Sequence, residues 1–217
     1  MSEPPNVVML PVSKIRPNSF NVNSMDPETY QMLVEDVKKN GVLLLEPIQV
    51  RKVKDFYECI NGEQRFRAVK DAGWPKIPSL VFDVTEDEAR VLCYQKNRER
   101  GKIDPILEAK LFAYEKKRGL TSEQMAKKYN LSSPQYVRDS LQLLGIREDV
   151  AKIIPPSIRE QKSKLRLLAG LKDPDKQVQA IKEISESETV TDKQLKERIS
   201  RKEVSFPLQY LSHPHHV

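Results

Sequence analysis

The sequence predicts an α+β protein in which a small mixed-sheet domain is followed by an all-α domain with a helix-turn-helix. Short β-branched or aromatic segments flanked by turn residues are confined to the chain before residue 85. From Glu86 onward, helix start and stop signals repeat and no convincing strand follows. Charge divides the chain too: residues 1–92 hold 12 Lys and Arg against 14 Asp and Glu, and residues 93–217 hold 25 against 17.

The N-terminal domain is expected to span residues 1–95. Its four predicted strands are Val7–Leu10, Ile48–Arg51, Tyr57–Ile60 and Ile77–Val84. Asp26 is placed to cap a helix between the first two strands, with Pro27 at its first position and Gly41 as its stop. The apolar face of that helix is expected at Met32, Leu33 and Val37. A second helix begins near Glu63 and ends before Gly73.

The helical domain is expected over residues 96–202, with a flexible tail over residues 203–217. Asp173-Pro174 repeats the pattern of a capping residue before a first-position proline, and Pro155-Pro156 interrupts the helical pattern. From the end of the last strand onward, the predicted helices are Glu86–Asn97, Pro105–Arg118, Thr121–Tyr129, Pro134–Leu144, Glu148–Ile154, Ser157–Ala169, Pro174–Ser185 and Asp192–Lys202.

Composition excludes several classes of protein. The 217 residues are 38% hydrophobic and 31% charged, and no apolar run approaches the ~20 residues that span a bilayer. The N-terminus shows no secretory signal, and two cysteines are too few for a disulfide scaffold. We therefore expect a cytoplasmic protein. The basic second half suggests a polyanionic partner such as nucleic acid, with Lys-rich solvated helix faces as the alternative.

Residues 121–144, TSEQMAKKYNLSSPQYVRDSLQLL, have the layout of a helix-turn-helix. Thr121 and Gln124 form a capping box, Asn130 suits a tight turn, and Ser133 caps a second helix. An ordinary helical hairpin is the alternative. As a DNA-binding unit, it would contact bases and phosphates through Thr121, Ser133, Gln135, Tyr136, Arg138 and Asp139, with further phosphate attraction from Lys116, Lys117, Lys127 and Lys128.

Residues 62–68, GEQRFRA, follow a predicted strand and open a helix. Such a turn presents free N–H groups and the positive end of the helix dipole, and two arginines add charge, so it suits a phosphate. A turn with surface arginines is the alternative. Asn97–Arg100, NRER, could supply a metal or phosphate ligand or could be a solvated helix end. The histidines of the tail could bind a transition metal, but a loosely ordered tail without a metal is the favoured interpretation; they are His213, His215 and His216. Cys59 and Cys93 are interpreted as buried apolar residues.

The motifs in this order resemble the ParB family of DNA-partition proteins. GEQRFRA resembles the family's GERRxRA motif, and residues 97–109, NRERGKIDPILEA, resemble its ENxQRxxLxPxEEA segment. Residues 25–50 resemble the first family box, and the helix-turn-helix follows where the family places it. The resemblance covers roughly residues 7–202 and implies a ParB/sulfiredoxin-like N-domain before a helix-turn-helix domain.

The resemblance implies binding to a specific double-stranded DNA site in chromosome or plasmid segregation, near the nucleoid and without a membrane. It further implies a CTP-gated clamp, a homodimer that forms with DNA or nucleotide, and a ParA-type ATPase partner. Arg166 falls on a DNA-binding arginine of the family. The implied nucleotide-binding residues are Gly62, Glu63, Gln64, Arg65, Arg67, Asn97 and Arg100, with Asn97 also a Mg²⁺ ligand.

Departures from the family pattern predict weak or absent CTP hydrolysis. Gln64 replaces the first motif arginine, Lys96 replaces the acid before Asn97, and Glu99 replaces a glutamine. The family's C-terminal dimerisation domain has no match. Two alternatives use the same parts: a transcriptional regulator, or a nuclease or phosphotransferase with Glu63 or Glu35 as a base.

Overall fold

The structure is a computed structural model that describes residues 6–23, 25–43, 45–101 and 103–186. It contains two compact units that divide between Leu141 and Gln142. The division predicted near residue 95 stays a prediction; in terms of contacts, the residues on both sides of it belong to the first unit. The predicted helix Asp192–Lys202 and the predicted tail lie outside the described residues.

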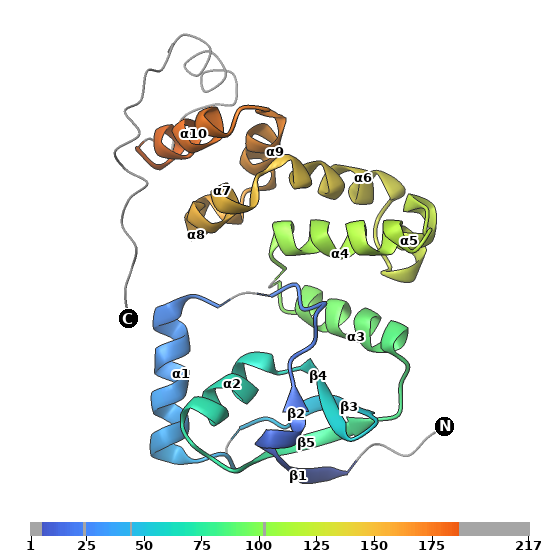
Figure 1. The fold of residues 1–217 in the computed structure, drawn as a ribbon, viewed down its shortest axis with the longest axis vertical. Helices are drawn as coiled ribbons and strands as arrows, with labels where there is room; N and C mark the ends of the chain where they lie inside the picture. Colours follow the sequence, from blue (N-terminus) through green and yellow to red (C-terminus); the bar gives the residue numbers. More distant parts are fainter. Residues whose placement is uncertain (1–5, 24, 44, 102, 187–217) are drawn as a thin grey trace. The chain divides into compact units, whose positions relative to one another are not determined.

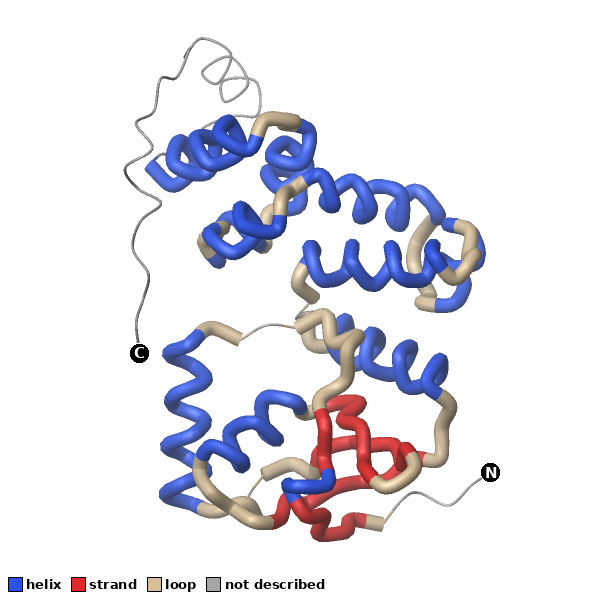
Figure 2. The backbone as a smooth tube through the Cα atoms, in the orientation of Figure 1, coloured by secondary structure: helices blue, strands red, loops and turns tan. Residues whose placement is uncertain are grey.

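A five-stranded mixed sheet forms the centre of the N-terminal part, drawn red in Figure 2. The strand order is β1-β5-β3-β4-β2; β1/β5 and β3/β4 are antiparallel, and β3/β5 and β2/β4 are parallel. All four predicted strands are present, and the sequence missed only the two-residue β2, which is too short to show alternation. The strands are β1 (Val7–Pro11), β2 (Ile15–Arg16), β3 (Ile48–Val53), β4 (Phe56–Asn61) and β5 (Lys76–Phe82).

The remaining elements of the first unit are helices that begin where the sequence places caps (Figure 1). Asp26 Oδ1 accepts the Thr29 N–H at 2.8 Å, which confirms the predicted cap of the first helix. The helices are α1 (Pro27–Asn40), α2 (Glu63–Asp71), α3 (Glu86–Glu99), α4 (Pro105–Lys117), α5 (Ser122–Lys128) and α6 (Pro134–Gln142), with a short 3₁₀ turn at Val12–Lys14.

Two hydrophobic cores lie on opposite faces of β4. Cys59 packs with α1 and α2 on one face, and its neighbour Ile60 packs with α3 on the other, as the two-residue period of a strand requires. The second core continues through Phe112 of α4 into α5 and α6. The predicted apolar face of α1 is partly wrong: Met32 is 66% exposed, and Val34 packs inward with Val37 instead.

The described residues of the second unit form helices and the short connections between them. It comprises the 3₁₀ turn Leu143–Gly145, α7 (Glu148–Ile153), α8 (Pro156–Arg159), α9 (Lys162–Gly170) and α10 (Pro174–Glu186). The prediction of one helix over Ser157–Ala169 is wrong. Gln161 has an extended backbone. In a continuous helix its backbone N–H would donate to the Ser157 carbonyl, but here its side-chain Nε2 donates to that carbonyl instead, at 2.8 Å. None of the described helices has the length and apolar character to cross a bilayer.

Candidate nucleic-acid interface and anion pocket

Local capping fixes α5 at the start of the helix-turn-helix. Thr121 Oγ1 accepts the Gln124 N–H at 3.2 Å, and Gln124 Oε1 accepts the Thr121 N–H at 2.8 Å. This reciprocal pair is the predicted capping box. Met125 and Ala126 face inward from this helix, while Lys127 is exposed. Thr121 therefore has a structural role at this helix start, whether or not it also contacts DNA.

A tight turn joins α5 to α6. Asn130 takes a left-handed conformation, with φ of 51°, which asparagine tolerates better than most residues. The Leu131 N–H donates to the Ala126 carbonyl at 2.8 Å, and Arg98 of α3 donates to the Asn130 carbonyl. Ser133 Oγ accepts the Tyr136 N–H at 3.3 Å, which confirms Ser133 as a capping residue of α6. The turn is thus held locally and by α3.

The second helix, α6, presents polar groups outward. Gln135 and Arg138 are exposed, and Val137 and Ser140 on the opposite face are buried. Arg138 Nε donates to Gln135 Oε1 at 3.0 Å, and Gln135 Nε2 donates to Asp139 Oδ1 at 2.7 Å. These hydrogen-bonding side chains, on a short helix after a tight turn, are of the types that read base edges.

Tyr136 is oriented differently from these neighbours. Its hydroxyl donates to both carboxylate oxygens of buried Glu108 in α4, at 2.9 and 3.1 Å. The same carboxylate accepts from Tyr94 of α3 at 2.7 Å and from Ser140 at 3.2 Å. Burial, followed by the Glu108 charge, raises the pKa of Tyr94 above its usual range. Glu108 therefore ties α3 and α6 to α4, and sequence reasoning did not single it out.

The predicted phosphate-attracting lysines fall into two groups. Lys116, Lys117 and Lys127 are exposed. Lys128 is turned inward, with Nζ 2.9 Å from Glu115 and 3.5 Å from Asp87. Arg166 is exposed on α9 and belongs to the second unit, so the structure does not place it with α6.

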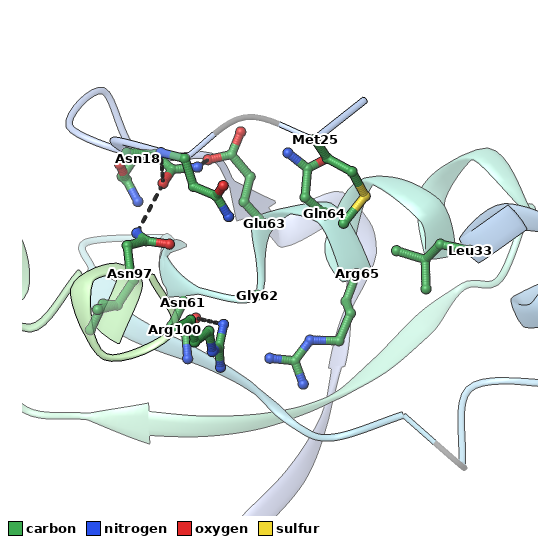
Figure 3. Close-up of a pocket in the computed structure, with 13 residues that line it drawn as sticks. Asn18, Met25, Leu33, Asn61, Gly62, Glu63, Gln64, Arg65, Asn97 and Arg100 are labelled. Carbon is green, nitrogen blue, oxygen red and sulfur yellow. Dashed lines mark hydrogen bonds between the residues drawn. The ribbon is translucent and has the colours of Figure 1, made fainter. Parts of the chain in front are cut away.

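An open pocket of about 240 Å³ lies where β4, α2 and α3 meet the loop after β2 (Figure 3). Six of the seven predicted nucleotide-binding residues line it; the exception is Arg67, which is exposed and pairs with Glu63 instead. The six are Gly62, Glu63, Gln64, Arg65, Asn97 and Arg100.

Gly62 lets the backbone at the pocket wall pass close to the side chains of Ile48 and Arg65. Its φ is 93°, a left-handed value, and a Cβ there would lie 2.8 Å from Ile48 Cγ2 and 3.0 Å from Arg65 Nη2. Gly62 is also the capping residue of α2, so the positive end of the helix dipole faces this region. The residue type, the backbone and the dipole therefore all suit an anion.

Two guanidinium groups, from Arg65 and Arg100, lie on the same side of Gly62 in Figure 3. Arg65 Nη1 donates to the carbonyl and to the carboxylate of Glu46, at 2.5 and 3.1 Å. Arg100 Nη1 donates to Asn61 Oδ1 at 3.0 Å. Burial is the main cause that lowers the pKa of Arg65, and the nearby charge of Arg100 lowers it further. An anion bound between the two guanidinium groups would offset both the burial of Arg65 and its repulsion from Arg100.

The opposite wall holds Glu63 and a cluster of amides. Glu63 Oε1 accepts from Arg67 Nε at 2.9 Å, and its Oε2 accepts from Asn21 at 3.0 Å. Asn97, which is buried, donates to the Cys93 carbonyl at 3.0 Å and to Asn21 Oδ1 at 3.3 Å. The sequence analysis missed four lining asparagines. They are Asn18, Asn21, Asn23 and Asn61. The asparagine-rich run NSFNVN was the available signal for the first three.

Two family models match this chain. The ParB N-terminal domain matches residues 2–107, and the ParB HTH domain matches residues 101–204. A nucleoid occlusion protein of Geobacillus sp. is 30% identical over 91% of this chain and 69% of its own length. The chromosome-partitioning protein Spo0J of Thermus thermophilus is 30% identical over 83% of this chain and 65% of its own length.

A solved structure, a Pnob8-like ParB-N domain, aligns with a TM-score of 0.54 at 14% identity. It covers 92% of this chain and 99% of that one, and at this identity it supports the fold alone. The chain spans about two thirds of the length of the two curated relatives described above.

Proposed function

This chain belongs to the ParB family, and on that premise we propose that it is a site-specific double-stranded-DNA-binding protein of chromosome or plasmid segregation. The observation that carries the proposal is the α5–α6 pair, capped at both helix starts, with Gln135 and Arg138 exposed on the second helix. Lys116, Lys117 and Lys127 add exposed positive charge in the same compact unit.

The proposal assigns base or phosphate contacts to the outward side chains of α6. Gln135, Arg138 and Asp139 form one hydrogen-bonded row, which orders their polar atoms before DNA arrives. Ser133 and Thr121 lie at helix starts, where backbone N–H groups favour phosphates. Tyr136 contributes by holding α6 through Glu108. Arg166 would add a contact from the second unit.

The pocket supports a second part of the proposal, a CTP-gated clamp. Gly62 and the start of α2, with Arg65 and Arg100, offer positive charge and close backbone approach to phosphates. The choice of cytidine as the base is inferred from the family resemblance. A homodimer that forms on DNA or nucleotide and a ParA-type ATPase partner are inferred in the same way. Residence near the nucleoid would follow from binding chromosomal sites.

The test of DNA recognition compares two charge-removing variants. The cognate site is first identified by sequencing host DNA crosslinked to the protein. Arg138→Ala should then lower affinity for that site at least tenfold, which is about 1.4 kcal/mol, and leave most non-specific binding intact. Lys39→Ala, which removes an exposed charge from α1, should change neither affinity.

Two outcomes would contradict the reading of α6. Equal losses on cognate and random DNA would reduce Arg138 to a phosphate contact. Absence of any enriched site in the host would make α5–α6 a structural hairpin. Narrow enrichment at promoters would instead identify a regulator, while broad shoulders around one site would support a sliding clamp.

A further inference from the structure

We infer that this pocket neutralises its nucleotide triphosphate with protein cations and binds it without a divalent metal ion. The inference rests on the proposed nucleotide-binding function and departs from the Mg²⁺ that the family resemblance implies. It is drawn from the carboxylates around the pocket, from the charge beside Asn97, and from the donors that remain.

Among the described residues, Glu63 is the single carboxylate that lines the pocket. Mg²⁺ is usually held by one or two carboxylates together with substrate phosphates. Both oxygens of Glu63 are already occupied, one by the guanidinium of Arg67 and the other by Asn21. In Figure 3 its carboxylate points away from Arg65 and Arg100, on the far side of Gly62. A metal bound to Glu63 would have to compete with Arg67 at Oε1 or with Asn21 at Oε2.

The residue next to Asn97 supplies no carboxylate for a cation. Lys96 carries a positive charge, and its Nζ lies 2.8 Å from Glu99 Oε2 on the exposed surface of α3. Glu46 is near the pocket only through Arg65, and its side chain is 81% exposed. Across the described ranges, no three His, Cys, Asp or Glu side chains gather as a metal site. The residues present therefore do not fit a resident Mg²⁺.

The donors that remain suit phosphate directly. Arg65 is only 14% exposed, so much of the cost of removing its charge from water has been met before a ligand binds. A guanidinium presents a planar fork that binds phosphate oxygens in pairs. Arg100 supplies a second fork from α3, and the start of α2 adds backbone N–H groups. Neutral amides, rather than acids, make up much of the rest of the wall: Asn18, Asn21, Asn23, Asn61 and Asn97.

The test is calorimetry of the full chain with CTP, in buffer with Mg²⁺ and in buffer with EDTA, each with and without cognate DNA. The dissociation constants with and without Mg²⁺ should agree within about threefold. A tenfold or greater loss in EDTA alone would overturn this inference and leave the proposed function standing. No heat in any buffer would overturn the proposed nucleotide function itself, and this inference with it.

Two matched variants separate protein cations from a metal. Arg100→Gln should weaken CTP binding at least tenfold, by the same factor in both buffers, because no metal can replace the lost charge. Lys70→Gln removes an exposed charge from α2 outside the pocket and should leave the affinity unchanged. If Mg²⁺ restored the affinity of the Arg100 variant, a metal would share the neutralising role and the inference would fail. Circular dichroism would confirm that both variants are folded.

Discussion

Replacing Tyr136 by phenylalanine separates two roles that this residue could have in DNA binding. Tyr136 lies at the start of α6, where a tyrosine could contact a base or a phosphate. Its hydroxyl instead donates to Glu108 at 2.9 and 3.1 Å. Phenylalanine keeps the ring and removes only this donor. The structure therefore predicts that Tyr136→Phe lowers the stability of the first unit and spares the DNA-contacting surface.

The expected loss of stability depends on the hydrogen bonds that the Glu108 carboxylate still accepts in the variant. A hydrogen bond to a charged group contributes about 1.5–3 kcal/mol. Glu108 is fully buried but would still accept from Tyr94 and Ser140, so it would not be left unpaired. We therefore expect the lower part of that range, about 1.5–2 kcal/mol. At roughly 2–4 °C per kcal/mol, the midpoint of thermal unfolding should fall by about 3–8 °C.

Two measurements on the same samples check this prediction. Chemical unfolding monitored by circular dichroism gives the change in stability, and fluorescence anisotropy with cognate DNA, well below the unfolding midpoint, gives the affinity. Tyr114→Phe is the matched control, since Tyr114 is an exposed residue of α4 and should change stability by less than about 0.5 kcal/mol.

The affinity of Tyr136→Phe for cognate DNA should stay within about twofold of the parent, or about 0.4 kcal/mol. Unchanged stability with a tenfold or greater loss of affinity would refute the reasoning. That result would mean that the hydroxyl faces DNA and that the Glu108 contact contributes nothing measurable to folding.

Three further predictions follow from single contacts. In the second unit, Gly145→Ala would place a Cβ 2.5 Å from a backbone oxygen of α9 and should destabilise by about 1–3 kcal/mol in chemical unfolding; Gly170→Ala, with open space around it, should be neutral or stabilise by up to about 1 kcal/mol. The hydrogen bond from Arg118 lowers the pKa of Asp87 from 3.8 to about 2, so its stabilising contribution is present above about pH 4 and is lost as the pH falls through 2. Because half of this carboxylate is exposed, that contribution should be about 1 kcal/mol or less, measured as the difference between parent and Asp87→Asn across that range. Glu46→Gln, which removes a competing carboxylate from the pocket arginine, should tighten CTP binding about two- to fivefold by calorimetry; weaker binding would show that Glu46 positions the arginine for the ligand.

The sequence by itself determined the features that depend on neighbouring residues. Asp26, Thr121 and Ser133 cap their helices as predicted, because each cap is a contact between a side chain and a backbone N–H two or three positions away. The sequence also predicted the position of Gly62 at the pocket, because a strand followed by a glycine and a helix is a pattern of neighbouring residues. The strand and helix signals indicated the fold class, and the order of motifs then indicated the family.

Only the tertiary structure decided which side chains meet across elements. Met32 and Val34 both suit an apolar stripe, and the position of α1 on the sheet buries Val34. Arg67 pairs with Glu63 four positions away on the same helix, a local contact that the sequence analysis did not use. Tyr136 instead turns inward to Glu108 of α4, because a buried carboxylate binds the donors that the packed helices bring within reach. The Tyr136–Glu108 contact is set by the distance between two segments 28 positions apart in the chain, and no local pattern encodes it.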